Sequence, residues 1–261
     1  MHKTFAVTLF IVLGTVFFAG TGFSQPITSV NDLEGKLVAV PQGTLADVLV
    51  METIPNTAVV YYEDAKACLD ALKAGPASAA AYDEPVMRSL LRNYPDLIML
   101  PEFITNDTYG LAVNLKNTEL KNTMDKVIRE SLVSGKLAEM EARWFAYSTD
   151  EPAPEPEVLK AQGQKVLRFG TAAVVEPFTF KNANGDIIGL DIELAGYIAQ
   201  ELGMRLQIVD MPFDEMIPAL QAGKVDMIGA CITISPNRKQ MVLFSIPYYR
   251  GGIVAVVKAG Q

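Results

Sequence analysis

The stretch Gly229–Lys239, which reads GACITISPNRK, decides how we interpret the chain. Its apolar half predicts a buried strand that runs into Thr233, and its polar half predicts a helix that opens at Ser235. Ser is a favourable N-cap, and Pro236 suits the first helical position, where its missing N–H group costs nothing. Arg238 then falls in the first helical turn, where the helix dipole disfavours a cation. A bound carboxylate, gripped by the guanidinium beside Thr233, would explain this position, and the alternative is an exposed Arg on a well-capped helix.

The composition excludes several classes of function. The chain has 261 residues, is 50% hydrophobic and carries a net charge of −8, which suits a globular protein of two modest domains. An acidic chain without a basic run is a poor nucleic-acid binder. The single His, His2, lies near the N-terminus, so histidine-based catalysis and metal binding are excluded from the mature protein, and no cofactor is expected. Cys68 and Cys231 are interpreted as two separate buried thiols, with a disulfide as the alternative.

Residues 1–25 are predicted to be a secretory signal peptide. They begin with Lys3, continue with the apolar run Phe5–Phe18 and end in small residues before position 25. No Cys stands near the expected cleavage region, so a lipid anchor is not indicated, and no later apolar run is long enough to cross a bilayer. The mature protein is therefore expected to be soluble and exported to the periplasm.

Strand and helix patterns alternate on both sides of a Pro- and Glu-rich segment at 148–164, which is predicted to be a flexible linker. Such alternation indicates an α/β fold with mostly parallel sheets. Strands are predicted at 37–40, 58–62, 77–81, 97–100, 166–170, 205–209, 225–230 and 252–257.

One short pattern occurs twice. Ala71–Gly75 reads ALKAG and Ala219–Gly223 reads ALQAG, and each is followed by a strand and a polar turn with Pro. The first unit delivers Asp83 and the second delivers Thr233 and Arg238. Two such units suggest two lobes that face a shared crevice, with chance similarity of Ala- and Gly-rich helices as the alternative.

An Arg on one lobe and an Asp on the other form the charge pair that a zwitterionic α-amino acid requires. Arg238 would take the carboxylate and Asp83 the ammonium, although Asp83 could instead be an ordinary helix N-cap. Thr44, at another predicted helix start, offers a hydroxyl to the carboxylate. Phe213 could cover the ligand or could be a core aromatic. No catalytic set is found; Glu176 is the one acid considered for catalysis, with a solvated loop residue as the alternative.

At this point two long segments resemble one family. Residues 167–258 contain PFTF, GDIIGLDIELAGYIAQELG, FDEMIPALQAGKVDMI and ITISPNRKQMVLFSIPYY, and resemble the first part of a family 3 extracellular solute-binding protein. Residues 30–145 contain SVNDLEGKLVAVPQGT, AAYDEP, TYGLAVN and GKLAEMEARWF, and resemble the rest of such a protein. These proteins are periplasmic receptors of ABC importers for polar amino acids, and the two segments cover nearly the whole mature chain.

The resemblance implies a two-lobed periplasmic-binding-protein fold of type II, with the ligand in a cleft between the lobes. It implies that Arg238 binds the α-carboxylate with Thr233 and Thr44, and that Asp83 binds the α-amine. It also implies that the Cys231 backbone faces the amine, and that Phe213 packs over the ligand.

Tyr82, within AAYDEP, and Ala172 fall at further ligand-binding positions of the resembled family. Some positions depart from the members with polar ligands: Ala172 and Val175 stand where a carboxylate and an aromatic residue are common, and Pro41 replaces a polar or basic residue. These departures favour an amino acid with a small or apolar side chain.

The order of the two segments is the reverse of the family's order, which resembles a circular permutation; a fragment of a tandem receptor is the alternative. The predicted small lobe covers 27–108, and the larger lobe combines 109–147 with 165–258. Asp107–Gly110 is then expected to be the only covalent hinge, which would favour a monomer or a lobe-swapped dimer. The expected partners are one amino acid and an inner-membrane ABC permease. An enzyme similar to cyclohexadienyl dehydratases and a ligand-presenting sensory subunit are the alternatives.

Overall fold

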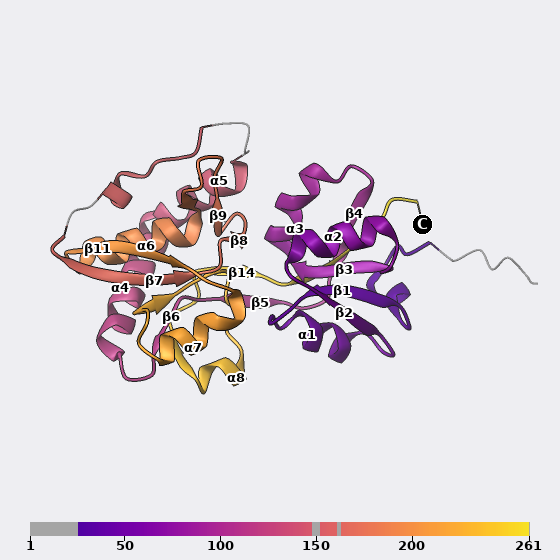
Figure 1. Cartoon of the computed structure of the whole chain (residues 1–261), viewed down its shortest axis with the longest axis horizontal. Helices are drawn as coiled ribbons and strands as arrows, with labels where there is room; N and C mark the ends of the chain where they lie inside the picture. The colour runs from indigo at the N-terminus through magenta and orange to yellow at the C-terminus, as the bar shows by residue number, and fades with distance from the viewer. Residues whose placement is uncertain (1–25, 148–151, 161–162, 261) are drawn as a thin grey trace, which may run out of the picture.

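The computed structural model describes residues 26–147, 152–160 and 163–260, so the predicted signal peptide lies outside the described residues. Two α/β lobes are joined by a pair of extended crossing strands (Figure 1). The two-lobed α/β fold predicted from the sequence is confirmed. No helix in the described ranges is long and apolar enough to span a membrane.

The small lobe is built on a five-stranded sheet in the order β2-β1-β3-β15-β4. β1, β2 and β3 are parallel, whereas β15 runs antiparallel to both β3 and β4. Every residue of β3 is buried, because this strand lies in the middle of the sheet and is covered by helices. The elements of this lobe are η1 (Val30–Leu33), β1 (Leu37–Pro41), α1 (Ala46–Thr53), β2 (Ala58–Tyr62), α2 (Ala65–Ala74), β3 (Ala79–Asp83), α3 (Glu84–Leu90), η2 (Leu91–Asn93), β4 (Leu97–Phe103) and β15 (Ile253–Lys258).

The large lobe is built on a second five-stranded sheet, in the order β11-β7-β12-β6-β13. α6 packs along β11 and against α4, whereas α7 contacts β7 and β12. The elements of this sheet and its helices are β6 (Ala112–Asn114), α4 (Thr118–Ser134), α5 (Lys136–Ala146), η3 (Glu157–Lys160), β7 (Lys165–Thr171), α6 (Leu190–Glu201), β11 (Met204–Asp210), η4 (Phe213–Glu215), α7 (Met216–Gln221), β12 (Met227–Ile228), α8 (Pro236–Lys239) and β13 (Val242–Phe244). A separate three-stranded sheet contains β8 (Val174–Val175), β9 (Thr179–Lys181) and β10 (Ile187–Ile188).

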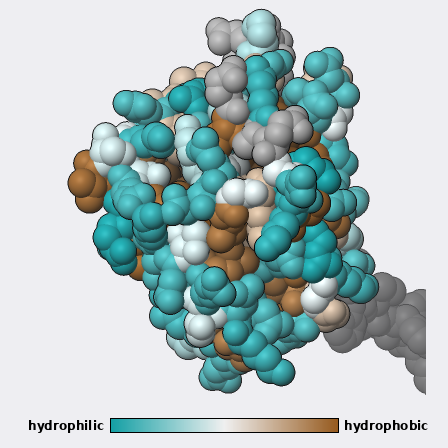
Figure 2. All heavy atoms as spheres, turned by 90° about the vertical axis from the view of Figure 1, so that its left-hand side faces the viewer, coloured by the Kyte–Doolittle hydropathy of each residue, from teal (hydrophilic) through white to brown (hydrophobic). Residues whose placement is uncertain are grey.

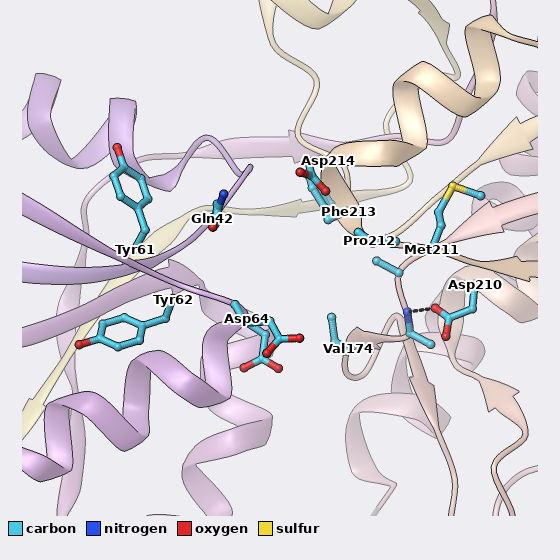
Figure 3. Close-up of a pocket in the computed structure, with 13 residues that line it drawn as sticks. Gln42, Tyr61, Tyr62, Asp64, Val174, Asp210, Met211, Pro212, Phe213 and Asp214 are labelled. Atoms are coloured by element: carbon cyan, nitrogen blue, oxygen red, sulfur yellow. Dashed lines mark hydrogen bonds between the residues drawn. The ribbon is translucent and has the colours of Figure 1, made fainter.

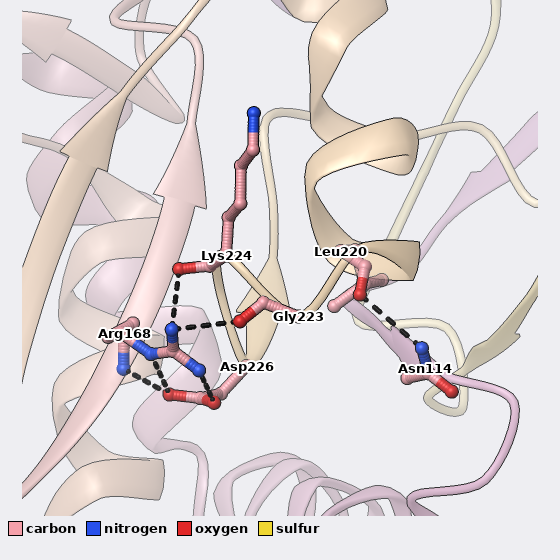
Figure 4. A network of polar contacts seen from close by, with 6 residues as sticks. All are labelled: Asn114, Arg168, Leu220, Gly223, Lys224 and Asp226. Atoms are coloured by element: carbon pink, nitrogen blue, oxygen red, sulfur yellow. Dashed lines mark hydrogen bonds and ion pairs between the residues drawn. The ribbon is translucent and has the colours of Figure 1, made fainter.

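A polar network fixes the turn between α7 and β12. Arg168 on β7 forms an ion pair with Asp226 at 2.6 Å and donates to the carbonyl oxygens of Gly223 and Lys224 (Figure 4). This turn follows the repeated ALQAG pattern, and Gly223 has a φ of 70°, which favours glycine. The outer end of the large lobe is mostly hydrophilic, with apolar residues scattered over it (Figure 2).

Two strands cross between the lobes, which corrects the predicted single hinge. β5 (Asp107–Tyr109) pairs antiparallel with β14 (Tyr249–Gly251), and the chain then continues into β15 of the small lobe. Residues 252–258 were assigned to the large lobe because they continue the sequence of its last elements. Their apolar strand instead completes the small sheet between β3 and β4, a pairing that sequence order does not reveal.

The predicted linker at 148–164 is partly structured where it is described. η3 packs on α6, and Val158 is buried there. An added Cβ on Gly196 of α6 would lie 2.8 Å from a methyl group of Leu159, so the glycine makes room for this contact. Residues 157–160 are therefore docked on the large lobe and differ in this respect from the flexible segment that their composition predicts.

Candidate functional site

The Arg238 loop differs from its sequence-based prediction in length. β12 ends at Ile228, and the chain then bends through Cys231, whose φ is 53°, before the single helical turn of α8. Ser235 caps α8 as predicted, and its hydroxyl accepts the backbone N–H of Arg238 at 3.3 Å. One turn of helix has little dipole, so the argument for a bound anion now depends on the guanidinium itself.

The guanidinium of Arg238 is buried without a carboxylate partner. Arg238 is only 7% exposed, donates from Nη1 to the carbonyl oxygen of Thr233 at 3.2 Å and lies over the ring of Phe213, 5.4 Å from its centroid. None of the ion pairs found among the described residues includes Arg238. Burial lowers the pKa of Arg238, but an Arg side chain stays charged in proteins. A buried cation without a counter-charge is costly, and an anionic ligand group would supply one.

Asp83 is buried on the opposite lobe. It ends β3, is 3% exposed and makes no side-chain cap of α3, which removes the interpretation as an ordinary N-cap. The hydroxyl of Tyr109 donates to Asp83 Oδ1 at 2.5 Å. Burial raises the pKa of Asp83 to about 7, while the hydrogen bond from Tyr109 and the charge of Arg238 lower it. Arg238 and Asp83 therefore influence each other across the boundary between the lobes.

Two cavities lie where the lobes face each other, and Phe213 and Asp214 line both. The smaller, about 340 Å³, brings together Thr44 of the small lobe and Arg238 and Phe213 of the large lobe. The hydroxyl of Thr44 also donates to the carbonyl oxygen of Pro41 at 2.9 Å, so it is held by its own turn. This cavity unites three of the residues predicted to surround the ligand carboxylate.

The larger cavity, about 590 Å³, is acidic and aromatic. The small lobe contributes Tyr61, Tyr62 and Asp64 from one side, and the large lobe contributes Asp210 and the 211–214 turn from the other (Figure 3). Ala172 also lines it, as does Glu63, and no Lys or Arg is among the described residues that line it. The remaining carboxylates are those of Asp210, which pairs with Lys181 at 2.7 Å, and Asp214.

The other predicted site residues lie beside these cavities without lining them. Tyr82, Thr233 and Cys231 are all buried. The backbone N–H of Cys231 donates to Asp191 Oδ2 at 3.0 Å, which anchors the backbone at this positive φ. Cys68 and Cys231 are both free thiols, which confirms the prediction that they do not pair.

Contacts between the lobes flank the cavities. Ser89 of α3 donates to Glu176 Oε1, in the turn between β8 and β9, at 2.7 Å. Arg92 of η2 donates to the carbonyl oxygens of Phe145 and Tyr147, at the end of α5, at 2.7 and 2.5 Å. Glu176, considered as a catalytic acid from the sequence, is therefore engaged in a bond between the lobes. Tyr109 and these contacts were not anticipated, since each depends on two segments far apart in the chain.

Residues 167–261 match the family of bacterial extracellular solute-binding proteins, family 3. This segment belongs to the family 3 solute-binding proteins. It contains α6, the 213 turn, the Arg238 loop and both cavity walls of the large lobe that precede β14. The resemblance stated from the sequence is thereby confirmed for this part of the chain, while the reversed order of the two halves stays a prediction.

Several family 3 relatives from bacteria are similar to this chain. The putative ABC transporter arginine-binding protein 2 of Escherichia coli is 33% identical over 40% of this chain and 42% of its own length. The arginine-binding extracellular protein ArtP of Bacillus subtilis is 38% identical over 37% of each chain, and the histidine-binding periplasmic protein of Salmonella typhimurium is 35% identical over 32% of each. The alignments therefore span well under two thirds of these relatives.

Solved structures show the same partial likeness. An ancestral arginine-binding protein bound to arginine is 46% identical, over 34% of this chain and 39% of that chain, with a TM-score of 0.32. The arginine-bound form of domain 1 from TmArgBP is 36% identical, over 41% of this chain and 89% of that chain, with a TM-score of 0.33.

Proposed function

We propose that this chain is a periplasmic receptor that closes its two lobes on one free amino acid. The observation that carries the proposal is the buried Arg238, which has no counter-charge in the described structure and faces a cavity shared by both lobes. A ligand carboxylate would form bidentate hydrogen bonds with the guanidinium, beside Thr44. The ligand ammonium would lie against Asp83, so that each buried charge gains a partner.

The ligand side chain would extend into the larger cavity and carry a positive charge. Glu63, Asp64, Asp210 and Asp214 give that cavity a negative potential, which favours cations. The named relatives are arginine- and histidine-binding proteins, and they do not support the small or apolar side chain expected from the sequence. The departure at Ala172 removes one carboxylate position from the large lobe, but the folded cavity gathers carboxylates from both lobes.

The receptor would deliver its ligand to a membrane permease of an ABC importer, as the relatives' names and the secretory N-terminus suggest. The monomer and the lobe-swapped dimer remain the two proposed states. The argument for exchange of lobes is weaker than the sequence suggested, because two strands cross between the lobes and exchange would have to break both. Light scattering of the purified protein distinguishes the two states by mass.

A thermal-shift screen of the purified exported protein tests the proposed function. The panel contains arginine, lysine, histidine, glutamine, alanine and leucine, together with agmatine and 5-guanidinopentanoate, which lack the carboxylate and the amine of arginine. A ligand at 100 times its dissociation constant stabilises by about 2.7 kcal/mol. Stabilisation by one or more basic amino acids, and little by either analogue, is expected. A protein stabilised by neither basic nor other amino acids would contradict the receptor function.

The proposed activity is binding without chemical conversion. The acid considered for catalysis, Glu176, already bonds to Ser89, and Asp83 bonds to Tyr109. Incubation with prephenate or arogenate is therefore expected to give no product, and product formation would instead support the dehydratase alternative.

A further inference from the structure

Tyr109 is fully buried on β5, at the crossing between the lobes. Its backbone forms an isolated antiparallel bridge with Thr233, and the neighbouring Thr108 carbonyl accepts the N–H of Ile234 at 2.9 Å. Its own carbonyl accepts the N–H of Tyr248 at 3.1 Å. The backbone of this strand therefore fixes the loop that carries Thr233 toward Arg238.

The side chain of Tyr109 reaches the other end of the proposed site. Its hydroxyl donates to Asp83 Oδ1, and its ring stacks on Tyr249 of β14 with a centroid distance of 5.8 Å and an interplanar angle of 11°. Phe178 contacts the same ring edge-on, at 6.2 Å. The ring is thus held on two sides, which sets the direction in which its hydroxyl points.

We propose that Tyr109 is a positioning residue of the amino-acid site. Its hydroxyl occupies one oxygen of Asp83 and leaves Oδ2 as the oxygen that receives the ligand ammonium, while its backbone fixes Thr233 beside the ligand carboxylate. One residue of the crossing strand thereby sets the spacing between the two ends of the site. This inference rests on the proposed function and adds the residue that registers the two lobes.

The charge state of Asp83 provides a readout of this role. The groups that face Asp83 are Tyr109 and Asp107 of β5, Arg238 of α8 and Tyr82 of its own strand. Burial and Asp107 favour the protonated carboxyl, whereas Tyr109, Arg238 and Tyr82 favour the carboxylate. Removal of the Tyr109 hydroxyl should therefore raise the pKa of Asp83 and make ammonium binding more sensitive to acid.

Tyr109→Phe is the test, because it keeps the stacked ring and removes the hydroxyl. Tyr249→Phe is the matched control, since it keeps the same stack and the described residues include no hydrogen bond of the Tyr249 hydroxyl. In the ligand-free protein, the carboxyl carbon resonance of Asp83, assigned through Asp83→Asn, is followed by NMR as pH is varied. Arginine binding to each protein is then measured by calorimetry at pH 6 and pH 8.

In Tyr109→Phe the titration midpoint of Asp83 is expected to rise, with no change in Tyr249→Phe. If the midpoint rises by one pH unit, the fold-loss of affinity should be about five times larger at pH 6 than at pH 8. An unchanged midpoint together with equal losses at both pH values would overturn the positioning role and leave the receptor function intact. Failure of the unmodified protein to bind any amino acid would overturn the function itself, and the ligand-free titration keeps the two failures distinct.

Discussion

The two ends of the proposed site are both buried and charged, yet they are prepared in different ways. Arg238, on the large lobe, has a backbone carbonyl and an aromatic face as neighbours and no carboxylate partner among the described residues. Asp83, on the small lobe, already accepts a hydrogen bond from Tyr109, and its pKa is raised to about 7 by burial. The anion-binding end therefore stays charged and lacks a counter-charge, whereas the ammonium-binding end can neutralise itself by taking a proton.

This difference implies a division of labour between the lobes. The Arg238 end should contribute most to affinity, because its charge cannot be removed and the ligand gives it a partner. The Asp83 end should contribute more to selectivity for amines and to pH dependence.

Arg238→Met should produce the largest effect of the four changes that follow. Loss of one half of a buried charge pair should weaken amino-acid binding by about 2–5 kcal/mol. Because Arg238 lacks a counter-charge in the free protein, the same substitution should leave the melting temperature of the ligand-free protein equal or higher. Calorimetry and thermal unfolding measure the two effects. Arg250→Ala, at an exposed position on β14, is the matched control; a clear loss of folding stability in Arg238→Met would show that Arg238 stabilises the fold.

Asp83→Asn should give the next largest effect, and the effect should depend on the ligand. It keeps the size of the side chain but loses the negative charge, so binding of an α-amino acid should weaken by about ten- to a hundredfold, or roughly 1.4–2.8 kcal/mol. The deaminated analogue lacks the ammonium, so its weaker binding should stay nearly unchanged. Equal weakening of both ligands, measured by competition calorimetry, would mean that Asp83 is structural.

Acidification should weaken binding through Asp83 alone. The ligand ammonium needs the ionised carboxylate, and with a pKa of about 7 that form is lost as pH falls through 7. Affinity for an α-amino acid should therefore fall about tenfold between pH 8 and pH 6, with little change above pH 8. The deaminated analogue and the Asp83→Asn protein should both lack this dependence. A flat profile for the unmodified protein would place the pKa of Asp83 well below 6.

The contacts between the lobes should make the smallest contribution. Ser89→Ala removes the bond to Glu176, which should weaken ligand binding by about 0.5–1.5 kcal/mol, mainly through faster dissociation. Ser134→Ala, which removes a local bond within α4, is the control. Stopped-flow dissociation and X-ray scattering of the free protein are the measurements. Unchanged dissociation in Ser89→Ala would show that this contact is not part of the closed, ligand-bound form.

Local signals predicted most of the individual elements. β2, α2 and α4 occupy the predicted residues, and both repeated units end their helices at glycine and open the next helix with proline, as expected. These features depend on neighbours in sequence, such as apolar periodicity, capping side chains and glycine at a positive φ. The strand before Thr233 was overestimated because an apolar run does not reveal the bend at Cys231.

The sequence by itself determined the α/β class, the two lobes and the two charged residues, because periodicity, caps and charge are written residue by residue. Tertiary structure alone decided that residues 253–258 join the small sheet, that two strands cross between the lobes and that Tyr109 bonds to Asp83. It also decided that carboxylates from both lobes line one cavity. Each of these features pairs segments far apart in the chain, and such pairings are selected by shape and burial in the folded protein rather than by local preference.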